Sequence, residues 1–423
     1  MAARSSTRCV IVGAGHGGVQ VAASLRNEGF AGEIVVVDAD QSVPYHKPPL
    51  SKTFIEAPRS PVLELQAPTF YADANVDARL GTRVIDIDRA RREVFLDSGE
   101  ALAYSHLVIA TGSKPIDLIN IKGAGLRGIL TLRSLNDARS ISGRLAETRT
   151  VAIVGGGFIG IELAHTLNKL GKMVTVLESA PRILGRVVSP VTSDYMLRRT
   201  RECGIEIRLD AKAEAFLGNG TVTSVATDCG APIECQMAIV AVGARAVTEL
   251  AAKAGLAVDG GIVVDEFLQT EDSHIFAIGD CSKFPEWRSG VRLRLESVQN
   301  ATDQAKTVAK TIAGRPTPYR SVPWFWSDSG DMRLQIAGVA GGADRSIVSG
   351  EPNDGSFAVY RYDGDRLVCV EALNRPSEYM LARKLLAADI SPTRDDILAG
   401  PARLRELLAV GSAPRATAAL ERG

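Results

Sequence analysis

The sequence predicts an α/β fold built from two βαβ domains, with a small α+β domain at the C-terminus. Two glycine-rich segments, at residues 13–18 and 155–160, each follow a short aliphatic run and precede a segment of helical length. After Pro323 the pattern changes to two strand-like runs around Asp363-Gly364-Asp365, which is typical of a β-hairpin. The 423 residues suffice for two or three such domains.

The composition is that of a globular protein with a large hydrophobic core. Hydrophobic residues make up 45% of the chain and charged residues 23%, which is ordinary for such proteins. Lysine and arginine together number 49, as do aspartate and glutamate, so the zero net charge gives no argument for binding nucleic acid or an anionic membrane. No apolar run approaches the roughly 20 residues that a membrane span needs.

The cysteine usage and the N-terminus favour a cytoplasmic protein. The six cysteines are scattered, with neither a CxxC pair nor metal-ligand spacing, as expected in a reducing compartment, and no metal site is predicted. The first predicted strand begins close to Met1, so residues 1–7 form a short polar lead and not a signal peptide.

The first βαβ unit opens the chain. Residues 9–12 are expected to form a buried parallel strand, residues 17–28 the helix after it, and residues 33–37 the next strand. Further strands are expected at 83–88, 93–96 and 107–110.

The second unit begins at residue 150 and runs to about residue 178, followed by alternating segments up to a strand at 239–243. Strands at 262–264 and 275–278 are out of sequence for this unit, so the simplest account is that the chain returns to the first domain. The predicted domains are therefore a discontinuous first domain (1–113 and 246–322), an inserted second domain (114–245) and a C-terminal domain (323–423).

Each glycine-rich segment matches the Rossmann-like fingerprint for a dinucleotide. The first glycine allows a tight turn, the second lets the pyrophosphate approach the backbone, and the third packs the helix on the sheet, with the helix N-terminus facing the phosphates. The candidate residues are Gly13, Ala14, Gly15, Gly17 and Gly18 in the first domain and Gly155, Gly157, Phe158, Ile159 and Gly160 in the second. Two such sites in one chain predict two dinucleotides face to face, and the usual reason for that arrangement is electron transfer.

An acidic residue ends the second strand of each unit. Glu178 can accept hydrogen bonds from ribose hydroxyls and repel a 2′-phosphate, so NADH is expected rather than NADPH. In the first unit Asp38 closes the strand and Asp40 stands close behind it. Either carboxylate could bind a ribose, and Asp38 is favoured.

A third element indicates that the first dinucleotide is a flavin. The apolar run at 275–278 ends in Gly279-Asp280, and a buried strand with this ending can put one carboxylate beside a polyol chain. Together with Ala110-Thr111-Gly112 and the first fingerprint, this pattern predicts FAD in the first domain.

With these motifs the chain resembles the FAD-dependent, NADH-using ferredoxin reductases that serve haem-thiolate monooxygenases and ring-hydroxylating dioxygenases, of the putidaredoxin reductase and biphenyl dioxygenase reductase type. The resemblance covers essentially the whole chain. Its most specific parts are the runs Pro48-Pro49-Leu50-Ser51-Lys52 and Trp324-Phe325-Trp326. It continues through Thr131-Leu132-Arg133 and through the segments at 296–301 and 372–376.

The resemblance implies particular roles. Lys52 and Glu162 correspond to an ion pair beside the flavin, where a cation stabilises negative charge on the reduced ring. Trp326 corresponds to the aromatic residue at the flavin edge that faces the electron acceptor. The remaining implied FAD contacts are Lys47, Pro48, Val84 (through its backbone), Arg133, Gly279, Asp280 and Val298, and the implied NADH contacts are Ile159, Glu178, Arg186 and Gly243.

The chain departs from the family pattern at two of these places. Lys47 stands where many relatives have arginine, which keeps the charge and loses the bidentate fork. Ser329 stands where many relatives have glutamine, in the stretch after Asp328 that bears on the local surface.

The resemblance also implies a [2Fe–2S] ferredoxin with an acidic docking face as the electron acceptor. Lys306 and Arg405 are the candidate basic contacts on this chain, although most surface lysines and arginines serve only solubility. A monomer is favoured.

Two alternatives share parts of this pattern. A pyridine nucleotide–disulfide or peroxide reductase needs a redox cysteine against the flavin, but residues 38–65 contain none, and Cys229, Cys235 and Cys281 stand elsewhere. A protein like apoptosis-inducing factor shares the Pro-Pro-Leu-Ser-Lys run, but the Trp-Phe-Trp run and the zero net charge argue against it. Steady-state oxidation of NADH with a ferredoxin would separate the reductase from this binding protein.

Overall fold

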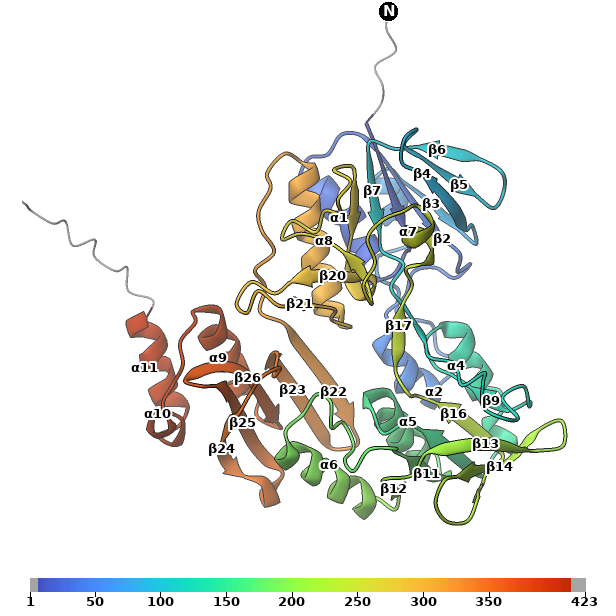
Figure 1. Cartoon of the computed structure of the whole chain (residues 1–423), viewed down its shortest axis with the longest axis vertical. Coiled ribbons are helices and arrows are strands. Elements are labelled where there is room, and N and C mark those ends of the chain that lie inside the picture. Colours follow the sequence, from blue (N-terminus) through green and yellow to red (C-terminus); the bar gives the residue numbers. More distant parts are fainter. Residues whose placement is uncertain (1–6, 412–423) are drawn as a thin grey trace, which may run out of the picture. The chain divides into compact units, whose positions relative to one another are not determined.

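The first glycine-rich segment follows the central strand of a five-stranded parallel sheet with the order β19-β7-β1-β2-β3. Figure 1 labels β2, β3 and β7 of this sheet. The computed structural model describes residues 7–411, so nearly all of the predicted polar lead lies outside the described residues. The strands of this sheet are β1 (Arg8–Val12), β2 (Glu33–Asp38), β3 (Val76–Leu80), β7 (His106–Ile109) and β19 (Ile275–Ala277). Because β19 follows the second glycine-rich segment in the chain, the chain returns to its first sheet after building the second.

Four strands of this sheet, β1, β2, β7 and β19, are mainly apolar runs whose central residues are buried, whereas the edge strand β3 alternates apolar and charged residues. Continuous runs are expected for parallel strands that are covered on both faces. Helix α1 (His16–Asn27) follows β1 and packs against α8 (Val298–Ile312). The strand and helix predicted at 9–12 and 17–28 correspond to β1 and α1.

The second glycine-rich segment follows the central strand β10 of a similar sheet with the order β12-β11-β10-β16-β9. All neighbouring strands in it are parallel. Helix α5 (Phe158–Lys169) follows the glycine-rich turn. The strands are β9 (Ile129–Leu130), β10 (Thr150–Val154), β11 (Met173–Leu177), β12 (Glu206–Arg208) and β16 (Met237–Val240).

Smaller sheets and helices complete this part of the chain. The strand expected at 262–264 is β18 (Ile262–Val263), which pairs with β20 (Ser282–Pro285) and so lies outside the parallel sheet. The other strands are β4 (Val84–Asp88), β5 (Glu93–Leu96), β6 (Ala101–Ala103), β8 (Ser113–Pro115), β13 (Ala213–Gly218), β14 (Val222–Thr227), β15 (Ile233–Glu234), β17 (Ala244–Ala246) and β21 (Arg292–Leu293). The other helices are η1 (Pro48–Ser51), α2 (Thr53–Glu56), α3 (Phe70–Asp73), α4 (Leu135–Ser142), η2 (Leu145–Glu147), α7 (Glu249–Lys253) and η3 (Gly279–Cys281).

The C-terminal residues form an antiparallel sheet with the order β22-β23-β26-β25-β24. Its predicted hairpin at 363–365 joins β25 to β26, and α9 covers a core that includes Tyr360 and Leu385. The elements are β22 (Trp324–Ser329), β23 (Met332–Gly338), β24 (Arg345–Glu351), η4 (Pro352–Asp354), β25 (Ser356–Asp363), β26 (Arg366–Leu373), α9 (Pro376–Ala387), α10 (Arg394–Leu398) and α11 (Pro401–Gly411).

Two compact units result, and the boundary between them does not follow the order of the chain. One contains residues up to Ser179 together with Gly204–Ser321, and the other contains Ala180–Cys203 together with the residues from Val322 onward. Helix α6 (Pro190–Glu202) therefore packs with the C-terminal sheet, although it stands between β11 and β12 in the chain. The predicted α/β class with two parallel sheets is confirmed, and the division into three domains stays a prediction.

No helix among residues 7–411 combines the length and the apolar character needed to cross a membrane.

Candidate functional site

The first glycine-rich turn is built so that its backbone, and not side chains, faces a ligand. Gly13 has a φ of +108°, and a Cβ there would lie 2.3 Å from the carbonyl oxygen of Ala110. A Cβ on Gly18 would lie 1.8 Å from the carbonyl oxygen of Gly13, so α1 can approach the turn only because Gly18 has no side chain. Beside Gly15 there is open space. This geometry fits the phosphates of a dinucleotide at the N-terminus of α1.

Asp38 is tied to this turn, and Asp40 is tied to the loop that follows. One carboxylate oxygen of Asp38 accepts a hydrogen bond from the backbone N–H of Ala14. Asp40 instead accepts from the backbone N–H of Ser42 at 2.9 Å and from the hydroxyl of Tyr45 at 3.2 Å. The position of Asp38 at the turn supports the choice of Asp38 over Asp40 as the ribose carboxylate.

The second turn repeats the same arrangement. Gly155 has a φ of +114°, and a Cβ there would lie 2.4 Å from the carbonyl oxygen of Ala241. Glu178 Oε2 accepts a hydrogen bond from the backbone N–H of Gly156 at 2.8 Å, as Asp38 does from Ala14. Beside Gly157 there is open space. The second turn therefore fits a second dinucleotide.

Asp280 is the centre of a polar cluster near the first turn. Arg133 Nη2 lies 2.6 Å from Asp280 Oδ2, and Ser113 Oγ donates to the same oxygen at 2.8 Å. Arg133 also donates from Nε to the carbonyl oxygen of Ser113 at 3.1 Å. The structure thus brings together Arg133 and Asp280, which the sequence predicts as separate FAD contacts. It adds Ser113, which the sequence does not predict as a site residue.

His16 is a site residue that sequence reasoning missed. It is the first residue of α1, it is buried, and its Nε2 atom has no hydrogen-bond partner among the described residues. Its ring lies edge-on to that of His46 at 5.2 Å. Burial, together with the nearby His46 and Lys47, lowers the pKa of His16 to about 4. The signal in the sequence was a histidine inside the glycine fingerprint.

Lys47 adds positive charge to the same cluster. Burial and the neighbouring Arg133 lower the pKa of Lys47, while Asp38 and Asp280 act in the opposite direction. The site thus holds a buried nitrogen without a partner on His16, two cations on Lys47 and Arg133, and open space beside Gly15. Together these groups fit the anionic pyrophosphate of FAD.

Lys52 and Glu162 connect the two sites. Lys52 Nζ lies 2.6 Å from Glu162 Oε2, and Ser51 Oγ donates to that same oxygen at 2.6 Å. Thr166, one turn further along α5, donates to the carbonyl oxygen of Ser51 at 2.8 Å. The residues before α2 are therefore fixed to Glu162 and Thr166 along α5, the helix of the second fingerprint. Ser51 and Thr166 are further contributors that the sequence did not indicate.

Other predicted site residues lie at the ends of elements. Val84 begins β4, Pro48 begins η1 and Val298 begins α8, while Thr111 donates from Oγ1 to the carbonyl oxygen of Val247 at 2.7 Å. Gly243 has a φ of +117° and its carbonyl oxygen accepts from the backbone N–H of Ile116 at 3.0 Å.

Trp326 and Arg186 belong to the unit that contains the C-terminal sheet. Trp326 packs on Trp324, with ring centroids 5.6 Å apart. Ser329 is buried at the end of β22, so this position lies inside the domain and not on its surface. The roles of Trp326 at the flavin and of Arg186 at the nicotinamide nucleotide remain predictions from the sequence.

The two candidate docking residues are exposed. Lys306 lies on α8, with its Nζ 3.1 Å from Asp303 Oδ1. Arg405 lies on α11.

No disulfide bond joins any two cysteines among residues 7–411. All six are free thiols, and Cys281, the one beside Asp280, is fully buried. Burial raises the pKa of the Cys281 thiol, which keeps it protonated and unreactive. No group of residues between 7 and 411 could hold a metal ion.

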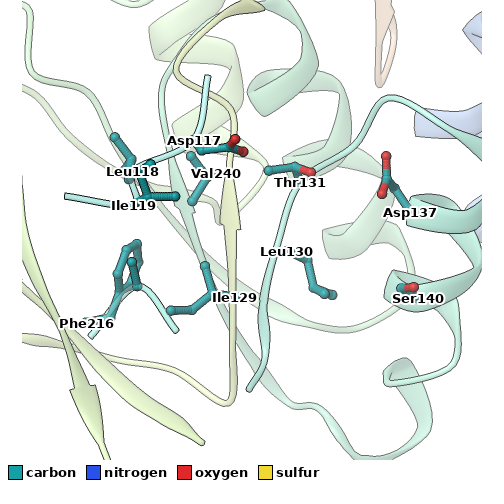
Figure 2. Close-up of a pocket in the computed structure, with 11 residues that line it drawn as sticks. Asp117, Leu118, Ile119, Ile129, Leu130, Thr131, Asp137, Ser140, Phe216 and Val240 are labelled. Atoms are coloured by element: carbon teal, nitrogen blue, oxygen red, sulfur yellow. The ribbon is translucent and has the colours of Figure 1, made fainter. Parts of the chain in front are cut away.

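Figure 2 shows a separate cavity of about 300 Å³ in the first unit. Ile119, Leu130, Phe216 and Val240 form apolar parts of its lining, and none of the lining residues is a predicted cofactor contact. Asp117 and Asp137 also line it, and Asp137 accepts from the backbone N–H groups of Arg133 at 3.0 Å and Ser134 at 2.8 Å. The cavity itself is therefore not assigned to a cofactor, although Asp137 helps to hold the backbone of Arg133.

Comparison with known proteins agrees with this geometry. The pyridine nucleotide-disulphide oxidoreductase family matches residues 7–305, and the reductase C-terminal family matches residues 324–408. Rhodocoxin reductase of Rhodococcus erythropolis is 39% identical over 386 residues, which cover 91% of this chain and 90% of that protein. A rubredoxin–NAD(+) reductase of Pseudomonas putida is 37% identical over 369 residues, which cover 87% of this chain and 96% of that protein.

A solved structure is similar over nearly the whole chain. The covalent complex of putidaredoxin reductase with putidaredoxin matches with a TM-score of 0.91 at 36% identity, covering 96% of this chain and 99% of that one. The predicted family, enzyme class and cofactors are thereby confirmed: this protein is an oxidoreductase that uses FAD and a nicotinamide nucleotide. With its matching catalytic and C-terminal regions, the chain belongs to the ferredoxin reductases of the pyridine nucleotide-disulphide oxidoreductase family.

Proposed function

We propose that this protein oxidises NADH and passes the electrons, through FAD, to a [2Fe–2S] ferredoxin that supplies a haem-thiolate monooxygenase or a ring-hydroxylating dioxygenase. The observation that carries the proposal is the Lys52–Glu162 pair, which connects the flavin segment of the chain to the helix of the nucleotide fingerprint. Bound FAD supplies the chemistry, because a flavin accepts a hydride and releases its electrons one at a time.

The residues at the second turn select NADH. Glu178 lies at the fingerprint, with Oε2 on the N–H of Gly156, and its charge would repel the 2′-phosphate of NADPH. Ribose hydroxyls, by contrast, can donate to this carboxylate. Arg186, Ile159 and Gly243 complete the proposed contacts to the nucleotide.

The residues near the first turn hold FAD and set its charge environment. With FAD bound, Lys47, Arg133 and the N-terminus of α1 would hold the pyrophosphate, and Asp280 would accept hydrogen bonds from the polyol. Lys52 brings positive charge to the flavin ring and favours its reduced, more negative form. Glu162 and Ser51 hold the Lys52 side chain in one position.

Electrons would pass from the flavin to the acceptor protein near Trp326. Lys306 and Arg405 would attract an acidic acceptor. The covalent complex of the similar putidaredoxin reductase with putidaredoxin supports a ferredoxin as that partner. A rubredoxin is the second candidate acceptor, because a rubredoxin–NAD(+) reductase is 37% identical to this chain. We also propose that the protein is cytoplasmic and monomeric.

The test is a steady-state assay with the purified flavoprotein. NADH and NADPH are compared as donors with a fixed artificial acceptor, and then an acidic [2Fe–2S] ferredoxin and a rubredoxin are compared as acceptors. The proposal expects a flavin spectrum, a clear preference for NADH, and faster reduction of the ferredoxin. A colourless protein, a preference for NADPH, or reduction of rubredoxin alone would overturn it. Size-exclusion chromatography with light scattering tests the monomer.

A further inference from the structure

Glu371 is a fully buried carboxylate in the C-terminal domain that no part of the proposed mechanism uses. It lies on β26 and its exposed fraction is 0%. A buried charge is stable only when several hydrogen bonds or an opposite charge compensate for the lost water. The hydrogen-bond partners of Glu371 therefore indicate which segment this carboxylate holds in place.

Three hydrogen bonds to Glu371 come from two residues of the segment Ala180–Cys203, which lies between β11 and β12 in the chain. Ser189 donates to Glu371 from its backbone N–H at 2.8 Å and from its hydroxyl at 2.7 Å. Thr192 donates from Oγ1 at 2.6 Å. The fourth hydrogen bond comes from Arg361 Nη1, at 3.2 Å, on the neighbouring strand β25.

This carboxylate holds the point where the segment turns into α6. Ser189 is the N-cap of α6, and Arg361, the ion-pair partner of Glu371, also donates to the carbonyl oxygen of Val187 at 3.3 Å. Further along the helix, Tyr195 packs edge-on against Phe357 at 5.5 Å, and Arg199 pairs with Asp331 at 2.7 Å. The residues after Val187 are thus fixed to the C-terminal domain along their length.

Arg186 stands immediately before this anchored stretch. Glu178 stands eight residues before Arg186, at the other end of the same loop. A loop that is already held in one conformation loses less conformational entropy when its side chain binds a ligand. Holding Val187 and Ser189 therefore restricts where Arg186 can be.

We propose that Glu371 is a positioning residue for NADH: it holds the loop that carries Arg186 and thereby raises the affinity for the nucleotide. This inference rests on the proposed contact between Arg186 and NADH. It assigns to the C-terminal domain a second task, in addition to the docking of the electron acceptor.

The experiment compares Glu371→Gln with a matched control, Glu378→Gln. Glu378 is also a buried carboxylate of the same domain, with an exposed fraction of 3%, and it is also paired with an arginine, Arg375. Its other partners, Ser349 and Tyr360, lie outside the segment 180–203. Both variants remove one buried charge from the same domain, but only the first removes the anchor of the loop.

Two measurements are made on the FAD-loaded proteins. Hydrogen exchange without nucleotide should become at least about tenfold faster at the amide of Ser189 in Glu371→Gln and stay unchanged there in Glu378→Gln. The KM for NADH, measured with ferricyanide, should rise about tenfold in Glu371→Gln alone, with kcat changing less than twofold. Ser189→Ala, which keeps the carboxylate and removes one donor, should show the same effects to a smaller degree and serves if Glu371→Gln does not fold.

Equal exchange at Ser189 in Glu371→Gln and the unaltered protein would overturn the anchoring. Faster exchange with an unchanged KM would overturn the positioning role, and Arg186→Ala then locates the fault. If Arg186→Ala also binds NADH normally, the proposed contact of Arg186 is wrong. If Arg186→Ala binds NADH weakly, that contact stands and only the role of Glu371 fails.

Discussion

Lys52 Nζ and Glu162 Oε2 are 2.6 Å apart, and this ion pair joins the two halves of the candidate site. The pair is well shielded from water, since the exposed fractions of the two side chains are 22% and 6%. The same carboxylate oxygen also accepts from Ser51 Oγ. Loss of one partner of a shielded pair is more damaging than loss of a surface pair, because the remaining charge has few other partners.

Glu162→Gln should slow the reduction of the bound flavin by NADH by tenfold or more, which corresponds to about 1.4 kcal/mol or more in the activation barrier. The amide keeps the shape of the side chain but no longer fixes the ammonium of Lys52 by charge. Stopped-flow absorbance at the flavin band measures this step directly, and the FAD content should stay unchanged.

Ser51→Ala is the control for this prediction. It removes one hydrogen bond to Glu162, worth about 1 kcal/mol, and leaves the ion pair in place, so the rate should fall by fivefold or less. A Glu162→Gln protein that is reduced as fast as the unaltered protein would mean that the pair has no part in hydride transfer.

Glu178→Ala should weaken the preference for NADH over NADPH. Loss of the carboxylate removes the ribose hydrogen bonds, worth about 1–3 kcal/mol, and also the repulsion of a 2′-phosphate. We expect kcat/KM for NADH to fall and kcat/KM for NADPH to rise, so that their ratio moves at least about tenfold.

The matched control for this change is Asp38→Ala. Asp38 holds the first fingerprint as Glu178 holds the second, through a backbone N–H of the turn. Its loss should lower the amount of FAD retained on purification and leave the preference between the two nucleotides unchanged. If the two variants behave alike, the assignment of one fingerprint to each dinucleotide is wrong.

The parts of the site that could be predicted from the sequence are those fixed by local pattern. The glycine turns and the acids Asp38 and Glu178 stand at set distances from an aliphatic strand, and each set of signals occurs within one βαβ unit. The Lys52–Glu162 pair spans 110 positions of the chain. It was predicted only because the surrounding run of residues resembles a known family.

The missed parts depend on contacts between distant segments. Ser189 and Glu371 are 182 residues apart, and neither belongs to a recognisable motif. The strand at 262–264 was predicted, but a short apolar run does not indicate which sheet it joins. His16 was overlooked because a histidine in a glycine-rich turn has no fixed meaning until its burial is known. The identity of the ferredoxin depends on exposed charges, which most surfaces carry for solubility.

His16 should make the stability of the FAD-free protein depend on pH. Its pKa is lowered from 6.5 to about 4 by burial and by His46 and Lys47, so the unfolded chain binds the proton first as the pH falls. Above pH 6.5, His16 therefore does not lower the free energy of unfolding. As the pH falls from 6.5 toward 4, its protonation in the unfolded chain lowers this free energy progressively. At about pH 5 the loss is about 2 kcal/mol.

Urea unfolding of the FAD-free protein and of His16→Leu measures this effect. The free energy of unfolding should fall between about pH 7.5 and about pH 5 in both proteins, but by about 2 kcal/mol less in the variant. Between about pH 7.5 and about pH 8.5, where His16 is neutral in both states, the two proteins should show the same pH dependence. Parallel curves over the whole range would show that His16 titrates normally.

Lys306→Glu should weaken the coupling to an acidic ferredoxin and make it less sensitive to salt. Lys306 is 56% exposed, so its charge acts through water and is screened by added ions. A reversal of charge at a docking surface mainly lowers the rate of association, by about tenfold at low salt. The measurement is the KM for the ferredoxin as a function of ionic strength.

Lys253→Glu is a closely matched control for the docking prediction. Lys253 is 57% exposed and lies 3.1 Å from Asp86, while Lys306 lies 3.1 Å from Asp303, so both substitutions make the same change in charge beside a carboxylate. Both variants should reduce ferricyanide at the unaltered rate, because no docking is needed. Only Lys306→Glu should lose ferredoxin coupling, and equal losses in both variants would show that net charge, and not a docking site on α8, attracts the partner.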